Sequence, residues 1–500
     1  MLISFQKKVL SHIPVIYIFL VAIGLRFVNL GYSDYQGDEI KALFRPLAGA
    51  SLLSFLLDQR KGPLQFLITY LMSFVTTYSN EFLMRLPFAL AGVFSVLFLY
   101  KLVAEHFGKK IALYAAFLLA TNGLFVAFSR IVQYQSYVIL FSILTLYFFT
   151  LAVKTEKWRV WGIYAGFLSW AIAVLFHYDG VFIAPLIVYL SYKWFKLSNN
   201  VPIRSKLVHY ITAALTAGAL VGSFYIPFFL SVSEKTIAYW TDRISGGSDK
   251  LSSSIITFKA YNPKLIFYIY CSLSVLSVIR IKTFWPFLLW FLFPWMILEV
   301  FTNVPGTHIY TYLMPATVIA AFGVEVVDSF MIKVLGHKLG GTLSILGLLA
   351  AALFASYLPY KVFVEHRTEY PWEAEKFLVW ELQKPNVIFH LSLFGFPYYR
   401  HWEEIGRYMT TTQNNGYYST NERDAITRYY VPFKKDTDLA GHFVYIHNPQ
   451  SFTNTIEKDK VNYWLTKHKP DKVFYNGART VADVYYMPAG SHEAIVASGY

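Results

Sequence analysis

Long apolar runs recur along most of this 500-residue sequence and constrain its fold more than any other feature. Three of the clearest cover residues 84–105, 134–153 and 207–230. Each is close to the roughly 20 residues that an α-helix needs to cross a bilayer. Charged residues make up only 15% of the chain, whereas a soluble globular protein carries roughly 25%. The sequence therefore predicts a mainly α fold, a polytopic bundle of membrane helices.

The positions of lysine and arginine predict which side of the membrane each loop faces. Lys7 and Lys8 precede the first span and so place the N-terminus in the cytoplasm. The second apolar stretch, 63–78, is short enough to be either a span or a helix in the interface. If it does not cross, the short basic loops all face the cytoplasm, and each basic residue near an anionic leaflet contributes roughly 1 kcal/mol. We therefore predict about eleven spans plus one interfacial helix. The predicted spans are 13–30, 84–105, 111–129, 134–153, 159–176, 180–197, 207–230, 263–280, 283–301, 308–330 and 341–360.

The pattern changes after residue 360, where short mixed segments replace the long apolar runs. Strand-like runs cover 387–393, 442–447, 472–475 and 483–487, and helix-like stretches cover 372–382, 401–409 and 457–467. We predict a transmembrane domain over 1–360, whose first outer loop, 31–83, carries the chemistry. A soluble extracytoplasmic α/β domain follows over 361–500.

Several other classes of protein are excluded by composition. The single cysteine, Cys271, lies in an apolar run and offers neither a disulfide nor a cysteine metal site. The net charge of +14 comes from basic residues scattered through short loops, so we expect no nucleic-acid partner. The first apolar segment has no small-residue cleavage site and is interpreted as an anchor.

Asp38 and Glu39 are the first candidates for chemistry, because they follow directly on the first apolar run. The predicted topology places them at the outer membrane surface, with the basic residues Arg45 and Lys61 close behind. Acids in the first turn of a helix can simply cap it and complement its dipole. Acids and bases together at a membrane edge can also act on a charged lipid headgroup.

Two arginines at the predicted outer ends of spans are candidates for binding phosphate. Arg85 can be a snorkelling interface residue, but its planar guanidinium also suits a phosphate. Arg130 is so closely flanked by apolar residues that it is costly unless paired, which favours a functional role. Near it, Gln133 and Gln135 can hydrogen-bond a sugar, and Tyr134 can stack on one.

His177 and Asp179 lie in a polar turn at another predicted outer junction, and His308 begins a later span. The purely structural interpretation of His177 and Asp179 is a polar turn that ends at Gly180. His177 is also a candidate for substrate binding. With His308 and the acids it can in principle bind a metal, although the spacing resembles no metal motif. We therefore expect no required cofactor and leave a divalent metal open.

A succession of motifs between Asp38 and Val153 carries a resemblance to known enzymes. The motifs are Asp38–Glu39, Gly62–Pro63 opening a short apolar helix, an Arg-Leu-Pro span followed by Phe-Gly-Lys-Lys, and Ser-Arg-Ile-Val-Gln-Tyr-Gln-Ser. With them the first third of the chain resembles the GT-C superfamily of lipid-linked-sugar glycosyltransferases. The most similar families are the protein O-mannosyltransferases and the aminoarabinose transferases. The remaining spans match by hydropathy, and the segment 361–500 does not match.

The resemblance implies a polyprenyl-phosphate sugar as donor and a hydroxyl acceptor on a lipid, a glycan or a protein. Family members place a catalytic acid in the first outer loop, which maps onto Asp38 with Glu39 beside it. The residues expected to bind the donor phosphate are Arg85, Arg130, Lys61 and Arg45. Those expected to contact substrate are Gln133, Tyr134, Gln135 and His177. Relatives often carry an acid at the position of Gln135, so this chain lacks that contact.

The predicted function is an inverting glycosyltransferase at the outer face of the plasma (inner) membrane. Asp38 accepts the proton of the acceptor hydroxyl as it attacks the anomeric carbon. The phosphate leaving group needs cations rather than a general acid. The alternative is a transporter or flippase of lipid-linked sugars. Transporters usually show inverted repeats and matching broken spans, and the sequence shows neither.

Overall fold

The computed structural model describes residues 13–44, 51–197, 201–245, 258, 261–303, 305–370, 373–377, 380–382, 394–450, 455–488 and 491. Its internal contacts divide the chain into two compact units. The first unit comprises Met1–Val28, Phe44–Tyr70 and Pro87–Lys361, and the second comprises Asn29–Leu43, Leu71–Leu86 and Val362–Tyr500. Part of the segment between the first two predicted spans therefore belongs with the C-terminal residues.

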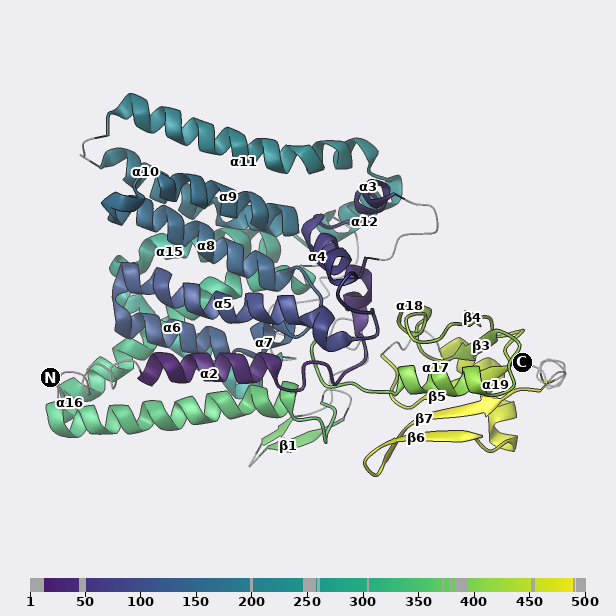
Figure 1. Ribbon diagram of the computed structural model, residues 1–500. Helices are drawn as coiled ribbons and strands as arrows, with labels where there is room; N and C mark the ends of the chain where they lie inside the picture. The colour runs from purple at the N-terminus through teal and green to yellow at the C-terminus, as the bar shows by residue number, and fades with distance from the viewer. Residues whose placement is uncertain are drawn as a thin grey trace. The chain divides into compact units, whose positions relative to one another are not determined.

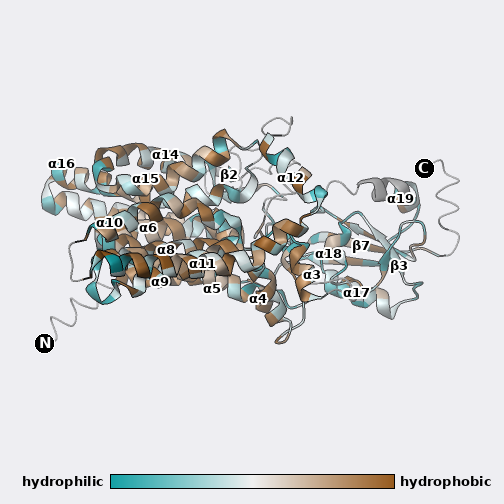
Figure 2. Ribbon diagram, turned by 90° about the horizontal axis from the view of Figure 1, so that it is seen from above, coloured by the Kyte–Doolittle hydropathy of each residue, from teal (hydrophilic) through white to brown (hydrophobic). Residues whose placement is uncertain are grey.

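The first unit is a helical bundle, and the mainly α fold predicted from the sequence is confirmed. Its α-helices are α2 (Ile13–Phe27), α3 (Leu52–Leu57), α4 (Leu64–Met72), α5 (Glu81–Phe107), α6 (Lys109–Thr121), α7 (Gly123–Ser129), α8 (Gln135–Lys154), α9 (Trp161–Phe176), α10 (Ala184–Lys196), α11 (Ile203–Ser231), α12 (Glu234–Ser245), α14 (Lys264–Ser277), α15 (Ile281–Trp295) and α16 (Tyr310–Pro359). The last residues of α4 and the first residues of α5 belong to the second unit. Short 3-10 or π helices are η2 (Glu156–Trp158), η3 (Tyr178–Ile183), η4 (Val278–Arg280), η5 (Met296–Val300), η6 (Gly306–Ile309) and η7 (Tyr360–Val364), the last of which continues into the second unit. Helix α9 packs between α8 and α11, and α16 packs on α6, α14 and α15 (Figure 1). Apolar residues dominate α8, α9 and α11, as expected for helices that exclude water on most sides (Figure 2).

Five helical stretches in the described part of the chain are long and apolar enough to cross a membrane, or six if the bent pair α6–α7 forms one span. Two of them, Lys264–Val300 and Gly306–Val364, each cover two of the predicted spans. The helices α2 and α9 are apolar but shorter. The count of about eleven spans therefore stays a prediction. Helix α4 has nine residues and is about 14 Å long at 1.5 Å per residue, too short to cross a bilayer alone.

The second unit contains a five-stranded mixed sheet with the order β4-β3-β5-β7-β6. Its elements are η1 (Gly37–Ala42), β1 (Glu375–Phe377), β2 (Trp380–Leu382), α17 (Trp402–Thr411), β3 (Tyr417–Thr420), α18 (Asp424–Thr427), β4 (Lys434–Lys435), β5 (His442–Ile446), α19 (Thr455–Lys467), β6 (Lys472–Asn476) and β7 (Arg479–Tyr486). Strand β3 runs parallel to β4 and β5, whereas β7 is antiparallel to β5 and β6. Val461 and Trp464 of α19 pack with Phe443 and Tyr485 of the sheet. Hydrophilic residues are more frequent around this sheet than in the helical bundle (Figure 2).

Most of the C-terminal elements lie where the sequence predicts them. Helices α17 and α19 match 401–409 and 457–467, and β5, β6 and β7 match three predicted strands. The predicted strand 387–393 lies outside the described residues. The helix predicted over 372–382 is wrong, because this stretch contains β1 paired antiparallel with β2. Its phenylalanine, valine and tryptophan favour a strand, and a helical period read over so short a run is a weak signal.

Candidate active site

The predicted acid pair lies on the short helix η1 in the second unit, where its two members have different environments. The Asp38 side chain is 45% exposed and accepts a hydrogen bond from Lys41 Nζ at 2.7 Å. The Glu39 side chain is fully buried. Glu39 Oε2 also accepts the backbone N–H of Gln36 at 3.1 Å, which closes the first turn of η1. Only Asp38 therefore presents its carboxylate to solvent.

Arg85 contacts Glu39 through two parallel hydrogen bonds, from Nε at 2.7 Å and from Nη2 at 2.9 Å. Its remaining N–H groups reach the backbone oxygens of Leu30, Ser33 and Asp34 at 2.8 to 3.1 Å. A guanidinium carries five N–H donors, and all five have acceptors within the second unit. Arg85 is thus bound to the loop that carries the acids, and in this arrangement none of its donors remains for a phosphate.

The loop before η1 is held by residues of the C-terminal segment, which sequence reasoning missed. Asp34 Oδ2 accepts the backbone N–H of Arg400 at 2.6 Å. The backbone N–H of Gly37 donates to Gln450 Oε1 at 2.8 Å, and Gln450 Nε2 donates to the backbone oxygen of Tyr35 at 3.0 Å. These partners are more than 360 positions apart, so no spacing in the sequence indicates them.

Asp34 and Arg400 form the buried centre of this attachment. The Arg400 guanidinium lies 2.5 Å from the Glu369 carboxylate and 3.9 Å from the centre of the Tyr398 ring. Burial raises the pKa of Asp34 well above its ordinary value, and the nearby Glu81 carboxylate adds to this. A buried acid that is hydrogen-bonded in this way is a structural link rather than an accessible base.

Lys61 lies with three of the predicted substrate-binding residues in the first unit. Its Nζ donates to Gln133 Oε1 at 3.0 Å and lies 5.1 Å from the centre of the Tyr134 ring. The Tyr134 ring in turn stacks on His177 at 4.0 Å, with 8° between the planes. The structure therefore brings Lys61, Gln133, Tyr134 and His177 together.

Gly62 explains how Lys61 reaches this group. A Cβ atom at Gly62 would lie 1.9 Å from the backbone oxygen of Leu175, at the end of α9. Only glycine permits so close an approach of two backbones. The contact fixes the start of α4 against the end of α9, and His177 follows that end directly.

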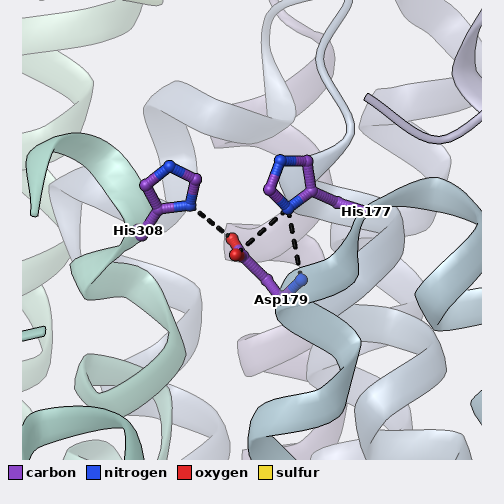
Figure 3. Close-up of side chains that lie close together, drawn as sticks. All are labelled: His177, Asp179 and His308. Atoms are coloured by element: carbon purple, nitrogen blue, oxygen red, sulfur yellow. Dashed lines mark hydrogen bonds and ion pairs between the residues drawn. The ribbon is translucent and has the colours of Figure 1, made fainter. Parts of the chain in front are cut away.

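His177, Asp179 and His308 converge beside the same group (Figure 3). Asp179 Oδ1 lies 3.1 Å from His177 Nδ1, and Asp179 Oδ2 lies 2.8 Å from His308 Nδ1. Tyr310 donates a further hydrogen bond to Asp179 Oδ2 at 2.8 Å. Burial lowers the pKa of His177 to about 4, so its imidazole is neutral at neutral pH.

The remaining predicted residues have separate environments. Arg130 Nη1 donates to the backbone oxygens of Leu25 and Val28, both at 2.9 Å, and so binds the end of α2. Gln135 is buried, and among the described residues its Oε1 has no hydrogen-bond partner. Arg45 lies outside the described residues.

Arg26 is a buried residue that sequence reasoning passed over. Its Nε donates to Ser129 Oγ at 3.3 Å and its Nη1 to the backbone oxygen of Ala120 at 3.1 Å. An arginine inside the first predicted span is a signal that could have found it.

One family model matches the sequence. Residues 60–222 match the model described as dolichyl-phosphate-mannose-protein mannosyltransferase. No curated protein matches the sequence.

Solved structures match the fold over most of the chain. ArnT from Cupriavidus metallidurans bound to undecaprenyl phosphate is 12% identical with a TM-score of 0.55, and the match covers 94% of this chain and 97% of that one. The oligosaccharyltransferase AglB from Archaeoglobus fulgidus, in complex with an inhibitory peptide and a dolichol-phosphate, is 12% identical with a TM-score of 0.53, covering 92% and 71%. The apo oligosaccharyltransferase of the same organism is 13% identical with a TM-score of 0.52, covering 86% and 65%.

At these identities the structural likeness shows the fold alone. The chain spans 65% of the length of the apo oligosaccharyltransferase. The resemblance to the GT-C glycosyltransferases that the sequence predicts is confirmed, by the family model over the residues that carry Lys61, Arg85 and Arg130 and by the fold over most of the chain.

Proposed function

We propose that this protein is an inverting glycosyltransferase that moves a sugar from a polyprenyl-phosphate donor to a hydroxyl acceptor at the outer face of the membrane. The observation that carries the proposal is the exposed carboxylate of Asp38, on a helix that the buried Glu39–Arg85 pair fixes. The similar structures that contain undecaprenyl phosphate or dolichol-phosphate support a donor of this class. The alternative of a transporter or flippase has no comparable support.

Asp38 serves as the general base in this mechanism. Its carboxylate accepts the proton of the acceptor hydroxyl while the hydroxyl oxygen bonds to the anomeric carbon. The bond from that carbon to the phosphate oxygen breaks on the opposite face, which inverts the configuration. The surface ion pair with Lys41 costs little to open, so an acceptor can displace it. Glu39 acts as a positioning residue, because both of its carboxylate oxygens are hydrogen-bonded.

Cations of the first unit stabilise the leaving polyprenyl phosphate. Lys61 precedes the N-terminus of α4 by a few residues, where the helix dipole also favours an anion. Gln133 and Tyr134 orient Lys61, and the Oε1 of Gln135 offers an acceptor for a sugar hydroxyl. Arg130 and Arg45 remain proposed phosphate ligands. Arg85 contributes by holding the acid loop.

The test is transfer from labelled polyprenyl-phosphate sugars in membranes that contain the full chain. We expect a labelled product with the wild type and a loss of about 10²–10⁴-fold in rate for Asp38→Asn, the range for removal of a general base. Asp438→Asn changes another exposed acid of the second unit and should leave the rate unchanged. Near-normal turnover of Asp38→Asn, with a wild-type melting temperature, would refute the role of Asp38. If the wild type transferred none of the labelled polyprenyl-phosphate sugars, the proposed function would be refuted.

A further inference from the structure

Three potential metal ligands of the first unit meet in one place. They are His177 at the end of α9, Asp179 in η3 and His308 in η6. One ligand atom from each lies within 4.8 Å of the others. His177 and Asp179 are almost fully buried, and His308 is 13% exposed. The convergence of these three residues from separate helices is plain in Figure 3.

The spacing of the ligand atoms suits a tetrahedral ion. Zinc holds nitrogen and oxygen ligands at about 2.0–2.2 Å, so neighbouring ligands of a tetrahedral ion lie roughly 3.3–3.6 Å apart. Asp179 Oδ1 is 3.1 Å from His177 Nδ1, and Asp179 Oδ2 is 2.8 Å from His308 Nδ1. The two distances involve different oxygens of Asp179, and one ligand atom from each residue lies within 4.8 Å of the others. Side-chain shifts of about 1 Å would bring the three ligands to tetrahedral spacing.

The contacts of His177 Nδ1 show which interaction a bound cation would replace. Its Nδ1 accepts the backbone N–H of Asp179 at 3.2 Å, and it also lies 3.1 Å from the carboxylate oxygen of the same residue. A nitrogen that accepts a hydrogen bond has no proton to donate to a carboxylate, and its one lone pair is used by that bond. A cation bound at this nitrogen would therefore replace the backbone N–H of Asp179 as its partner. The Asp179 carboxylate oxygen, 3.1 Å away, would then be a second ligand of the same ion.

The surroundings of the three residues hold them in place. Tyr310 donates to Asp179 Oδ2 at 2.8 Å, and the Tyr134 ring stacks on His177 at 4.0 Å. Trp170 Nε1 donates to the backbone oxygen of Gly180 at 2.8 Å and fixes the turn after Asp179. Hydrogen bonds and ring contacts of this kind orient the ligands of metal sites and raise their affinity.

We propose that His177, Asp179 and His308 bind one divalent transition-metal ion, for which zinc is the best match. A donor set of two imidazoles and one carboxylate binds zinc more readily than it binds magnesium or calcium, which prefer oxygen ligands. Three protein ligands leave a fourth position for water or another oxygen ligand. Tyr134 stacks on His177, and its ring centre lies 5.1 Å from Lys61 Nζ. An ion that fixes His177 therefore also helps to position Tyr134 and Lys61. The site does not depend on the proposed sugar transfer, and binding of the metal is measured by itself.

The experiment uses the purified full chain in detergent after chelation and removal of the chelator. Zinc binding is measured by calorimetry, and cobalt binding by the visible absorption of a tetrahedral cobalt site. We expect one ion per chain for the wild type. His308→Gln should weaken zinc binding by more than about 100-fold, because even loss of an outer hydrogen-bond partner costs 10–100-fold. Tyr310→Phe should weaken it by about 10-fold.

His337→Gln is the matched control, since His337 is an exposed histidine of the same unit. It should bind zinc as the wild type does. Binding of no stoichiometric ion by the wild type would overturn the proposal and leave a hydrogen-bonded His-Asp-His group. Equal zinc affinity of His308→Gln and His337→Gln would overturn it as well, and so would binding of magnesium in preference to zinc.

Discussion

Asp38 and Glu39 are neighbours in the chain, and the environments of their side chains decide what each can do. A general base must reach the proton that it removes. Asp38 meets this requirement because almost half of its side chain is exposed and its partner is a surface lysine. Glu39 does not, because Arg85 and the backbone of Gln36 enclose its carboxylate. Its contribution is to fix the turn on which Asp38 sits.

The first prediction at this scale concerns the buried pair of Glu39 and Arg85. Arg85→Gln leaves the Glu39 carboxylate buried without its cation, which typically costs about 3–5 kcal/mol of stability. We expect a clearly lower melting temperature in detergent. Glu39→Gln combined with Arg85→Gln should recover part of the loss, because no unpaired charge is then left buried.

Arg407→Gln is the control for this series. Arg407 forms a single exposed ion pair with Glu403 at 3.4 Å, and such pairs contribute about 0–1 kcal/mol. Its melting temperature should stay near that of the wild type. If Arg85→Gln melted as the wild type does but lost transfer activity, Arg85 would be a phosphate ligand and the pair would not be its main role.

The sequence identifies the residues of this group but not their pairing. Asp38, Glu39 and Arg85 stand out because charged residues beside apolar runs are costly. Glu39 and Arg85 are 46 positions apart, however, and which of the two acids meets the arginine depends on the turn of η1. Asp34, Arg400 and the other buried polar partners carry no local motif at all, so only the folded chain reveals them.

At the scale of elements, the backbone contact between α4 and α9 sets the position of Lys61. The contact at Gly62 leaves no room for a side chain. It brings the segment before α4 to the end of α9, where the rings of His177 and Tyr134 are stacked. The residues that position Lys61 thus lie just before the interfacial helix predicted over 63–78.

Gly62→Ala tests this contact. Its Cβ would overlap the backbone oxygen of Leu175, and overpacking of this kind costs typically about 1–3 kcal/mol. We expect a lower melting temperature, and we expect the position of Lys61 to be less well fixed. In Gly24→Ala the new Cβ meets nothing within 4 Å, and alanine favours a helix interior by about 0.5–1 kcal/mol. Equal melting temperatures of the two variants would contradict the role of Gly62.

Elements with a strong local signal were predictable, and those fixed by distant contacts were not. The helix α17 shows its apolar stripe in the sequence, with Trp402, Ile405 and Met409 buried on one side. The break in α16 falls at Gly336, whose φ of +75° suits glycine, within the gap predicted between 330 and 341. The hairpin of β1 and β2 was missed, because a short run with two apolar faces fits either a helix or a strand.

At the scale of the whole molecule, the unit that carries Asp38 is assembled from distant parts of the chain. Residues 29–43 and 71–86 belong with residues 362–500. The acid loop is held there by two buried hydrogen bonds, in which Gly37 N–H donates to Gln450 and Arg400 N–H donates to Asp34. Hydropathy alone divides the chain near residue 360, because it records apolar length and not contacts. The proposed chemistry requires this composite unit to face the outer side, where the polyprenyl-phosphate sugar is presented.

The last prediction is this orientation, tested by cysteine labelling in intact cells. The sequence has a single cysteine, Cys271, so Cys271→Ser gives a background without thiols. Thr410→Cys places a thiol on an exposed position of the second unit, and Lys157→Cys places one on an exposed position between α8 and α9. Because basic loops favour the cytoplasm, we expect a membrane-impermeant maleimide to label Thr410→Cys directly and Lys157→Cys only after permeabilisation. Labelling of Lys157→Cys but not of Thr410→Cys in intact cells would reverse the orientation, place the C-terminal unit in the cytoplasm, and remove the outer-face mechanism.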